Sequence, residues 1–316
     1  MSRDLRSTLL LLLLARATMA AAAVPPLKPP PAAAAATATG EYRKEIEDWR
    51  ADRLKGLRSP DGWLTLVGLF WLEEGENRFG SDPANRVVLP PGKTPPVAGT
   101  LIRRGDSVSV RAEPGAGLTS QGKPVSTTTA TAVRTDGKAV FRIGSVSFFL
   151  IKRGDRLGIR VKDSQSPALA AFRGVDEFPI QPDWRVEARF EPYRPPRQIP
   201  VANVLGQTEE QPSPGAVVFE HRGKTYRLDA LAGDDNGGLF FIFADQTNGH
   251  ETYGAGRFLE TGPPKDGLVV VDFNKAYDPP CAFTPFATCP LPPAQNRLAL
   301  RVEAGEKSYH GRDKAH

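Results

Sequence analysis

Residues 225–244 read TYRLDALAGDDNGGLFFIFA, and this stretch decides the fold class. Two runs of strand-forming residues, 225–230 and 239–244, flank the turn sequence Asp234-Asp235-Asn236-Gly237-Gly238. Asn-Gly accepts the positive φ that tight turns between antiparallel strands demand. The stretch therefore predicts a β-hairpin, and it makes antiparallel β-structure the first hypothesis for the whole chain.

The same pattern of short strand-forming runs and turn residues continues from this hairpin in both directions along the chain. Short β-rich runs separated by Gly, Pro, Asn or Asp occur at 63–72, 86–89, 107–111, 139–142, 146–152, 157–161, 186–190, 216–221, 256–260, 268–273 and 297–303. Many short strands with turn signals between them are typical of sandwiches and barrels. A chain of 316 residues also exceeds the size that one core usually serves. We expect a mostly β protein with two antiparallel domains, an N-terminal sandwich within 41–165 and a C-terminal barrel or sandwich within 166–316.

One amphipathic helix is expected at residues 41–58. Its apolar side chains fall roughly on one face, whereas the charged ones fall elsewhere. The apolar set comprises Tyr42, Ile46, Trp49, Leu54 and Leu57. The turn sequence of residues 59–62 then ends the helix, which we expect to pack as a lid across a sheet.

The first 40 residues lie outside the expected fold. Arg3 and Arg6 precede an apolar run at 9–14 and small residues at 17–23, which is the layout of a secretory signal spanning 1–23. Cleavage is expected after Ala20 or Ala23, so the protein is expected to be exported, periplasmic or secreted. The run is too short to span a bilayer, and no transmembrane anchor is expected. Residues 24–40, rich in Pro and Ala, are expected to form a solvated linker.

The charge pattern points away from nucleic acid. The formal net charge is +5, but arginines of the signal segment and Lys28 of the linker supply much of it. The remaining body is nearly balanced and has no basic run, so we expect no nucleic-acid partner. A small-molecule ligand or an envelope protein is the expected partner, and the protein is expected to be a monomer.

Several familiar motifs are approached but not completed. Residues 117–124 resemble a phosphate loop and hold Ser120 and Lys123 at penicillin-binding spacing, yet Pro124 and the strand context exclude both. The turn at 234–238 lacks the glycine position of a calcium loop, and His250-Glu251 lacks the second histidine of a metalloprotease helix. No cofactor is named by these patterns.

The densest polar chemistry follows two strands in the second half, at 245–257 and 272–274, ahead of a proline-rich segment at 277–293. Together with later residues these segments resemble the bacterial domain-of-unknown-function 1684 family, and residues 61–64 and 68–72 extend the resemblance over essentially all of the body. The resemblance implies no established activity. It rests on Thr252, Tyr253, Gly256, Arg257, Phe258, Asp272, Phe273, Asn274, Pro279, Pro280, Cys281, Cys289, Pro290, Asn296, Arg297, Leu298, Ala304, Gly305, Glu306 and Lys307. Residues 76–89 also resemble the opening of a forkhead-associated sandwich, without its phosphothreonine-reading residues.

Cys281 and Cys289 are the only two cysteines. Because an exported chain meets an oxidising compartment, a disulfide between them is the leading hypothesis. The alternatives are a metal site completed by His221 or His250, and a thiolate nucleophile acting with His250.

Three functions remain open at this point. The first is a binding module whose ligand site lies where the loops at 245–257 and 272–296 meet. Its candidate ligand-binding residues are Tyr253, Arg257, Asn274, Asn296, Arg297 and Glu306. The second is a hydrolase-like enzyme, with His250, Asp245 and Asp272 as catalytic candidates and His250 and Glu251 as metal-ligand candidates. The third is a structural envelope role. Turn capping, pairing of the carboxylates with Arg257 or Arg297, and a solvated loop histidine are the structural alternatives for the same residues.

Overall fold

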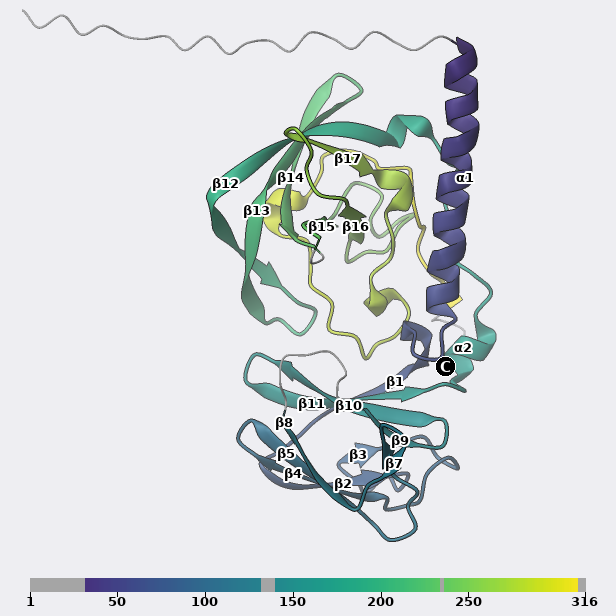
Figure 1. The fold of residues 1–316 in the computed structure, drawn as a ribbon, viewed down its shortest axis with the longest axis vertical. Helices are drawn as coiled ribbons and strands as arrows, with labels where there is room; N and C mark the ends of the chain where they lie inside the picture. The colour runs from purple at the N-terminus through teal and green to yellow at the C-terminus, as the bar shows by residue number, and fades with distance from the viewer. Residues whose placement is uncertain (1–31, 132–139, 234–235, 312–316) are drawn as a thin grey trace, which may run out of the picture.

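The computed structural model describes residues 32–131, 140–233 and 236–311. The expected signal segment, the first part of the expected linker, and Asp234 and Asp235 of the hairpin turn lie outside these residues. The fold is mostly β, as the sequence predicts, with one long helix beside the sheets (Figure 1). The short helical elements are η1 (Trp63–Thr65), α2 (Pro167–Ala171), η2 (Pro182–Trp184), η3 (Phe273–Lys275), η4 (Pro280–Ala282) and η5 (Ala294–Asn296).

Helix α1 (Ala32–Leu57) runs along the side of the second half (Figure 1). Tyr42, Ile46 and Leu57 are buried on one face, as the apolar pattern predicts. The helix begins at Ala32, so the expectation of a linker over 24–40 is wrong from that residue onward. Alanine has the highest helix propensity, and the segment after Ala32 contains no proline that would stop the helix. Among the described residues, no helix has the length and apolar character needed to cross a membrane.

The first half forms the expected sandwich of two sheets. One sheet has the order β3 (Val87–Val88), β2 (Gly75–Gly80), β4 (Gly99–Arg104), β5 (Ser107–Ala112), β8 (Thr127–Thr131). The other has the order β1 (Leu66–Trp71), β11 (Arg156–Asp163), β10 (Val146–Arg153), β9 (Phe141–Ile143), β6 (Thr119–Ser120), β7 (Lys123–Pro124). Phe79 from the first sheet packs on Phe148 from the second, with ring centroids 5.2 Å apart, so the two sheets share one core.

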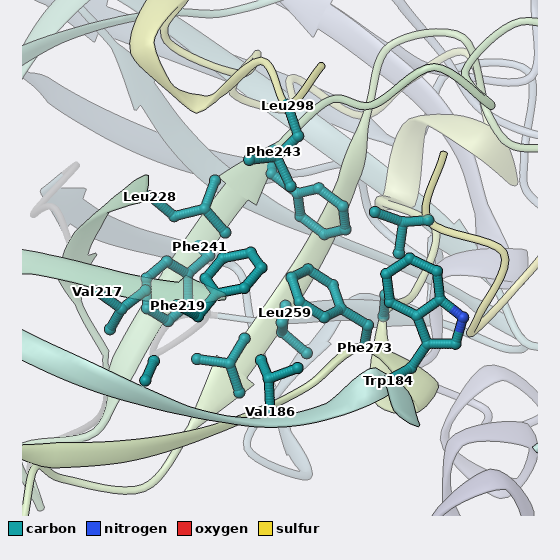
Figure 2. Packing of buried hydrophobic residues seen from close by; sticks show 14 of the residues in the cluster. Trp184, Val186, Val217, Phe219, Leu228, Phe241, Phe243, Leu259, Phe273 and Leu298 are labelled. Atoms are coloured by element: carbon teal, nitrogen blue, oxygen red, sulfur yellow. The ribbon is translucent and has the colours of Figure 1, made fainter. Parts of the chain in front are cut away.

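The second half is one six-stranded antiparallel sheet that curls partly around its core (Figure 1). Its order is β16 (Arg257–Thr261), β15 (Leu239–Phe243), β14 (Lys224–Ala232), β13 (Thr208–His221), β12 (Arg185–Ala202), β17 (Leu268–Asp272). Leu231 and Ala232 pair with Phe240 and Leu239, which confirms the predicted hairpin. Figure 2 shows the inner core, in which Phe219, Phe243 and Trp184 surround Phe273.

Strand β15 is buried on both faces. Phe241 and Phe243 enter the inner core, whereas Phe240 and Ile242 enter a second apolar cluster on the outer face. A strand covered on both sides has no need of alternating polar residues. This explains the uninterrupted apolar run at 239–244 that marks the sequence.

The outer cluster is closed by a long extension of two strands. Strand β12 has 18 residues, and a register shift between Pro192 and Arg197 interrupts its pairing with β13, which resumes from Arg197 to Ala202. Residues 197–213, the ends of β12 and β13 with their turn, are called the arm below. The arm reaches the sandwich, where Gln207 Nε2 donates a hydrogen bond to the Arg153 carbonyl oxygen at 3.3 Å.

Candidate functional site

The two polar loops that the sequence singles out lie side by side. Phe258 and Tyr277 exchange two backbone hydrogen bonds of 2.9 Å, which joins the start of β16 to the segment after β17. Helix α1 and the C-terminal segment 302–309 lie over this junction, as their contacts with Asp272, Asp278 and Glu306 show. The two loops therefore do meet, but Asp272, Asp278 and Glu306 at their junction are buried.

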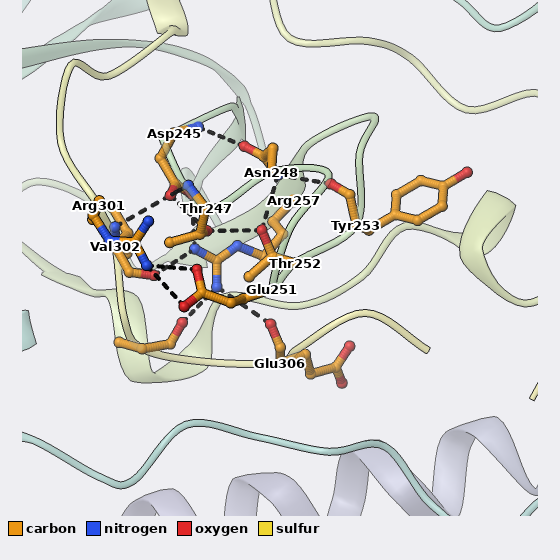
Figure 3. Close-up of polar contacts among 11 residues, drawn as sticks. Asp245, Thr247, Asn248, Glu251, Thr252, Tyr253, Arg257, Arg301, Val302 and Glu306 are labelled. Carbon is orange, nitrogen blue, oxygen red and sulfur yellow. Dashed lines mark hydrogen bonds and ion pairs between the residues drawn. The ribbon is translucent and has the colours of Figure 1, made fainter. Parts of the chain in front are cut away.

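Arg257 lies at the centre of the first loop (Figure 3). Its Nη2 donates to Asp245 Oδ2 at 2.8 Å, and both side chains are fully buried. The guanidinium also donates to the carbonyl oxygens of Val302 and Ala304. Asp245 Oδ1 accepts from the Thr247 hydroxyl and from two backbone N–H groups. These bonds fasten the loop to the C-terminal segment, and they occupy the groups that sequence reasoning offered to a ligand.

His250 lies exposed at the tip of this loop. Its backbone N–H bonds to the Thr247 carbonyl oxygen, and no hydrogen bond among the described residues involves its ring. The neighbouring Glu251 forms a surface pair with Arg301 at 2.6 Å. Within the described ranges, no three His, Cys, Asp or Glu side chains are grouped so that they could hold a metal ion. The hydrolase hypothesis therefore gains no support from the described residues and stays a prediction.

Asp272 and Asn274 form a second saturated network, with α1. The Tyr42 hydroxyl donates to Asp272 Oδ1 at 2.9 Å, and Asn274 Nδ2 donates to the Tyr42 oxygen at 2.9 Å. Asn274 also exchanges hydrogen bonds with the backbone of Gln181. Burial and then the Asp272 carboxylate raise the pKa of the Tyr42 hydroxyl above its usual range. The network anchors the helix at the end of β17.

Glu306 and Asp278 form a third network under the same helix. Glu306 Oε1 accepts from Arg53 Nε at 2.8 Å, and its Oε2 accepts from the Asp278 N–H at 2.6 Å. Asp278 Oδ2 accepts from the Tyr309 N–H, whereas its Oδ1 is buried without a hydrogen-bond partner among the described residues. Burial and then the charge of Glu306 raise the pKa of Asp278 to about 7. Sequence reasoning missed Asp278, because only its burial in the folded protein distinguishes it from other aspartates.

The remaining candidate ligand-binding residues divide between structure and surface. Asn296 is buried and exchanges two hydrogen bonds of 2.8 Å with the Asp229 backbone. Arg297 is exposed. Tyr253 is partly buried, and Figure 3 shows its ring directed away from the Arg257 network. None of the three lines the pocket that the structure contains beneath the arm.

Cys281 and Cys289 lie together in the outer cluster. Each backbone N–H lies 3.1–3.2 Å from the sulfur of the other residue. The contact with Cys281, together with burial, raises the pKa of the Cys289 thiol above its usual range. The structure holds both as thiols, so the disulfide stays a prediction. His221 instead stacks on Trp184 in the inner core, with ring centroids 4.2 Å apart, which does not fit the Cys/His metal alternative.

A pocket of about 270 Å³ lies between the arm, the outer face of β14 and β15, the end of β10 at Arg153, and the segment with Thr288 and Pro290. Its apolar part comes from Val201, Leu231, Phe240, Ile242 and proline side chains. Its polar part comes from Arg153, Asn203, Glu209, Gln211 and Thr288. Sequence reasoning placed a ligand site at the 272–296 loop, which carries Thr288, but it missed the other lining residues. The arm and the sandwich that supply them are brought together only by the fold.

A firm hydrogen-bonded corner closes the sandwich side of this pocket. Thr288 Oγ1 accepts from Arg153 Nε at 3.0 Å and from Arg160 Nη2 at 2.9 Å. Arg153 Nη1 also donates to the Lys152 carbonyl oxygen at 2.8 Å. Two bonds therefore hold the Arg153 guanidinium at the pocket wall.

Comparison with known proteins adds a family but no activity. No curated protein matches the chain. The solution structure of an uncharacterized protein from gene locus rrnAC0354 of Haloarcula marismortui is 34% identical, covering 44% of this chain and 78% of that chain, with a TM-score of 0.37. The sequence model of the family described as "Protein of unknown function (DUF1684)" matches residues 170–307, which include the motif residues from Thr252 to Lys307. Through this region, the chain belongs to the DUF1684 family.

Proposed function

We propose that this chain is an exported protein that binds a small molecule in the pocket beneath the arm. The observation that carries the proposal is the pocket itself, a space of about 270 Å³ with an apolar floor and polar groups at its edge. Ligand sites combine these two features, because apolar contact supplies affinity and a few fixed polar groups supply orientation. The walls come from four separate parts of the chain, which are Arg153, the arm, strands β14 and β15, and the segment with Thr288 and Pro290.

The strand-end loops are a less suitable place for the ligand than this pocket. Arg257, Asn274 and Asn296 are at most 1% exposed, and hydrogen bonds within the chain engage their side chains. A ligand would have to break those bonds to reach them, and an unpaired buried polar group costs roughly 1–3 kcal/mol. Thr288 and Pro290 are the contribution that the 272–296 loop makes to the pocket instead.

A substitution on the arm tests the pocket. Gln211 pairs with Ile199 and therefore lies on the arm face that carries the buried Ile199 and Val201. Gln211→Trp should fill the pocket. Glu210→Trp is the matched control, because Glu210 is exposed on the other face of the same strand.

The measurement is native mass spectrometry of protein purified from the periplasm of a bacterial host. A copurifying small molecule should be present in the parent protein and the Glu210→Trp variant, and absent from Gln211→Trp. Equal occupancy in all three proteins would place the ligand elsewhere and contradict the proposal. If nothing copurifies, the equilibrium binding of small organic acids, amines and alcohols from a library is measured for the same three proteins instead.

The export part of the proposal is supported by residues 1–23, whose charges, apolar run and small residues fit a secretory signal. Amino-terminal sequencing of the periplasmic protein should begin at Ala21 or Val24. An unprocessed amino terminus, or recovery only from the cytoplasm, would refute this part.

A further inference from the structure

We infer that the pocket selects a small carboxylic acid, with the carboxylate at Arg153 and a short apolar body against β14 and β15. The inference rests on the proposed function and deepens it, because it names the chemical class of the ligand. Its starting point is the charge on the pocket wall. Arg153 is the one cationic side chain among the lining residues that the structure describes.

Among the described residues, Arg153 has no carboxylate partner, which separates it from two arginines of helix α1. Arg50 pairs with Glu177 at 2.8 Å, and Arg53 pairs with Glu306 at 2.8 Å. For Arg153, no carboxylate in the described ranges lies within 4 Å. A guanidinium presents five N–H groups, and the hydrogen bonds of Arg153 use two of them. The remaining N–H groups are available to an anion.

The fixed orientation of Arg153 favours this role. Nε and Nη1 are tied to Thr288 and to the Lys152 carbonyl oxygen, so binding an anion does not have to order a flexible side chain. Thr288 Oγ1 already accepts two guanidinium N–H bonds, and its own proton has no acceptor among the described residues. The Thr288 hydroxyl can therefore donate to a ligand oxygen beside Arg153.

Two features favour a carboxylate over a doubly charged phosphate. A single lining arginine balances a single negative charge, and arginine binds carboxylates through paired N–H···O bonds. Glu209 is the one acidic residue of the lining, and it is exposed on the arm. Its charge disfavours a second negative charge on the ligand.

The body of the ligand meets an apolar floor. Leu231 and Ile242 are buried, and Phe240 packs edge-on against Phe258 with ring centroids 5.0 Å apart. A volume of about 270 Å³ corresponds to that of roughly nine liquid waters. An acid with one ring or a short alkyl chain fits this space.

The test compares two ligands with one skeleton, 3-phenylpropionate and 3-phenylpropanol, by isothermal titration calorimetry on the mature full-length protein at pH 7. The acid should bind at least about tenfold more tightly, the effect expected for a charge-assisted hydrogen bond. Arg153→Gln should remove this preference, so that the acid and the alcohol bind the variant equally; this residual binding also reports that the pocket is folded. Arg156→Gln removes the same charge from the same hairpin outside the pocket lining, and it should keep the preference.

Two further measurements test the charge of the ligand. Glu209→Gln should strengthen acid binding about two- to fivefold, because it removes an exposed like charge from the lining. 3-Phenylpropyl phosphate should bind less tightly than the carboxylate. A phosphate that binds more tightly would overturn the choice of carboxylate.

The outcomes separate this inference from the proposed function. Equal binding of acid and alcohol, both lost in Gln211→Trp, would refute the carboxylate inference and leave the binding function standing. A preference for the acid that persists in Arg153→Gln would refute the role of Arg153. No binding of either compound to the parent protein at millimolar concentration would refute the carboxylate inference, whereas the proposed function fails only if copurification and the library both yield no ligand.

Discussion

Asp278 offers the sharpest test of the electrostatics under helix α1. The residue is fully buried, one of its oxygens has no hydrogen-bond partner among the described residues, and Glu306 lies against its backbone N–H. Burial, followed by the charge of Glu306, raises its pKa from the ordinary 3.8 to about 7, against the opposing charges of Arg257 and Arg53. Below about pH 4 the carboxyl is protonated in both the folded and the unfolded protein. Between about pH 4 and pH 7 the folded protein keeps a proton that the unfolded chain has released.

The free energy of unfolding must therefore fall as pH rises through this window, by about 1.4 kcal/mol per pH unit. The full effect is about 4 kcal/mol, and it is complete above about pH 7. Asp278→Asn carries no charge and escapes this loss. Relative to the parent, the variant should gain about 2 to 3 kcal/mol of stability between pH 5 and pH 8.

Urea unfolding of both proteins at pH 5 and pH 8 measures this gain. Glu177 also has a pKa raised to about 7, by burial and despite Arg50, but it is present in both proteins and cancels in the difference. Asp155→Asn, at an exposed turn, is the matched control and should show no pH-dependent gain. A parent-to-variant difference that is the same at both pH values would refute the reasoning.

Three other changes test the remaining networks. Arg257→Met should destabilise the fold by about 3–5 kcal/mol, because it leaves Asp245 charged and buried, whereas Arg301→Met at the surface should cost less than about 1 kcal/mol in the same thermal unfolding assay. Tyr42→Phe removes the hydroxyl that bonds to the Asp272 carboxylate, so it should cost about 1.5–3 kcal/mol and speed proteolysis within α1. Protein from the periplasm should lack two thiol hydrogens by mass, and reducing the predicted bridge between the two cysteines should lower stability by about 2.5 kcal/mol; free thiols in that protein would contradict the disulfide.

The fold class could be predicted because its signals are local. The Asn236-Gly237 turn needs a positive φ, and Gly237 adopts φ +80 in the hairpin between β14 and β15. Apolar periodicity likewise located the buried face of the helix, with Tyr42, Ile46 and Leu57. The start of that helix was missed because the prolines before Ala32 made the whole segment look unstructured, although alanine itself favours a helix.

The candidate site shows where local signals end. Sequence alone identified the polar segments around Tyr253 and Asn274, and backbone hydrogen bonds do join the two loops. The sequence could not show that the side chains of Arg257, Asn274 and Glu306 form hydrogen bonds within the chain. Their partners are hundreds of residues away or belong to the backbone.

What the sequence determined by itself was therefore the antiparallel β class, the amphipathic helix and the family motifs, since each depends on neighbouring residues. Only the tertiary structure decided that Arg257, Asp272 and Asn274 are buried beneath α1 and the C-terminal segment, and that a pocket lies beside Arg153 and Thr288 instead. Burial and pocket shape arise when the arm, the curled sheet and the sandwich pack against one another. That packing joins residues far apart in the chain, so no local pattern reports it.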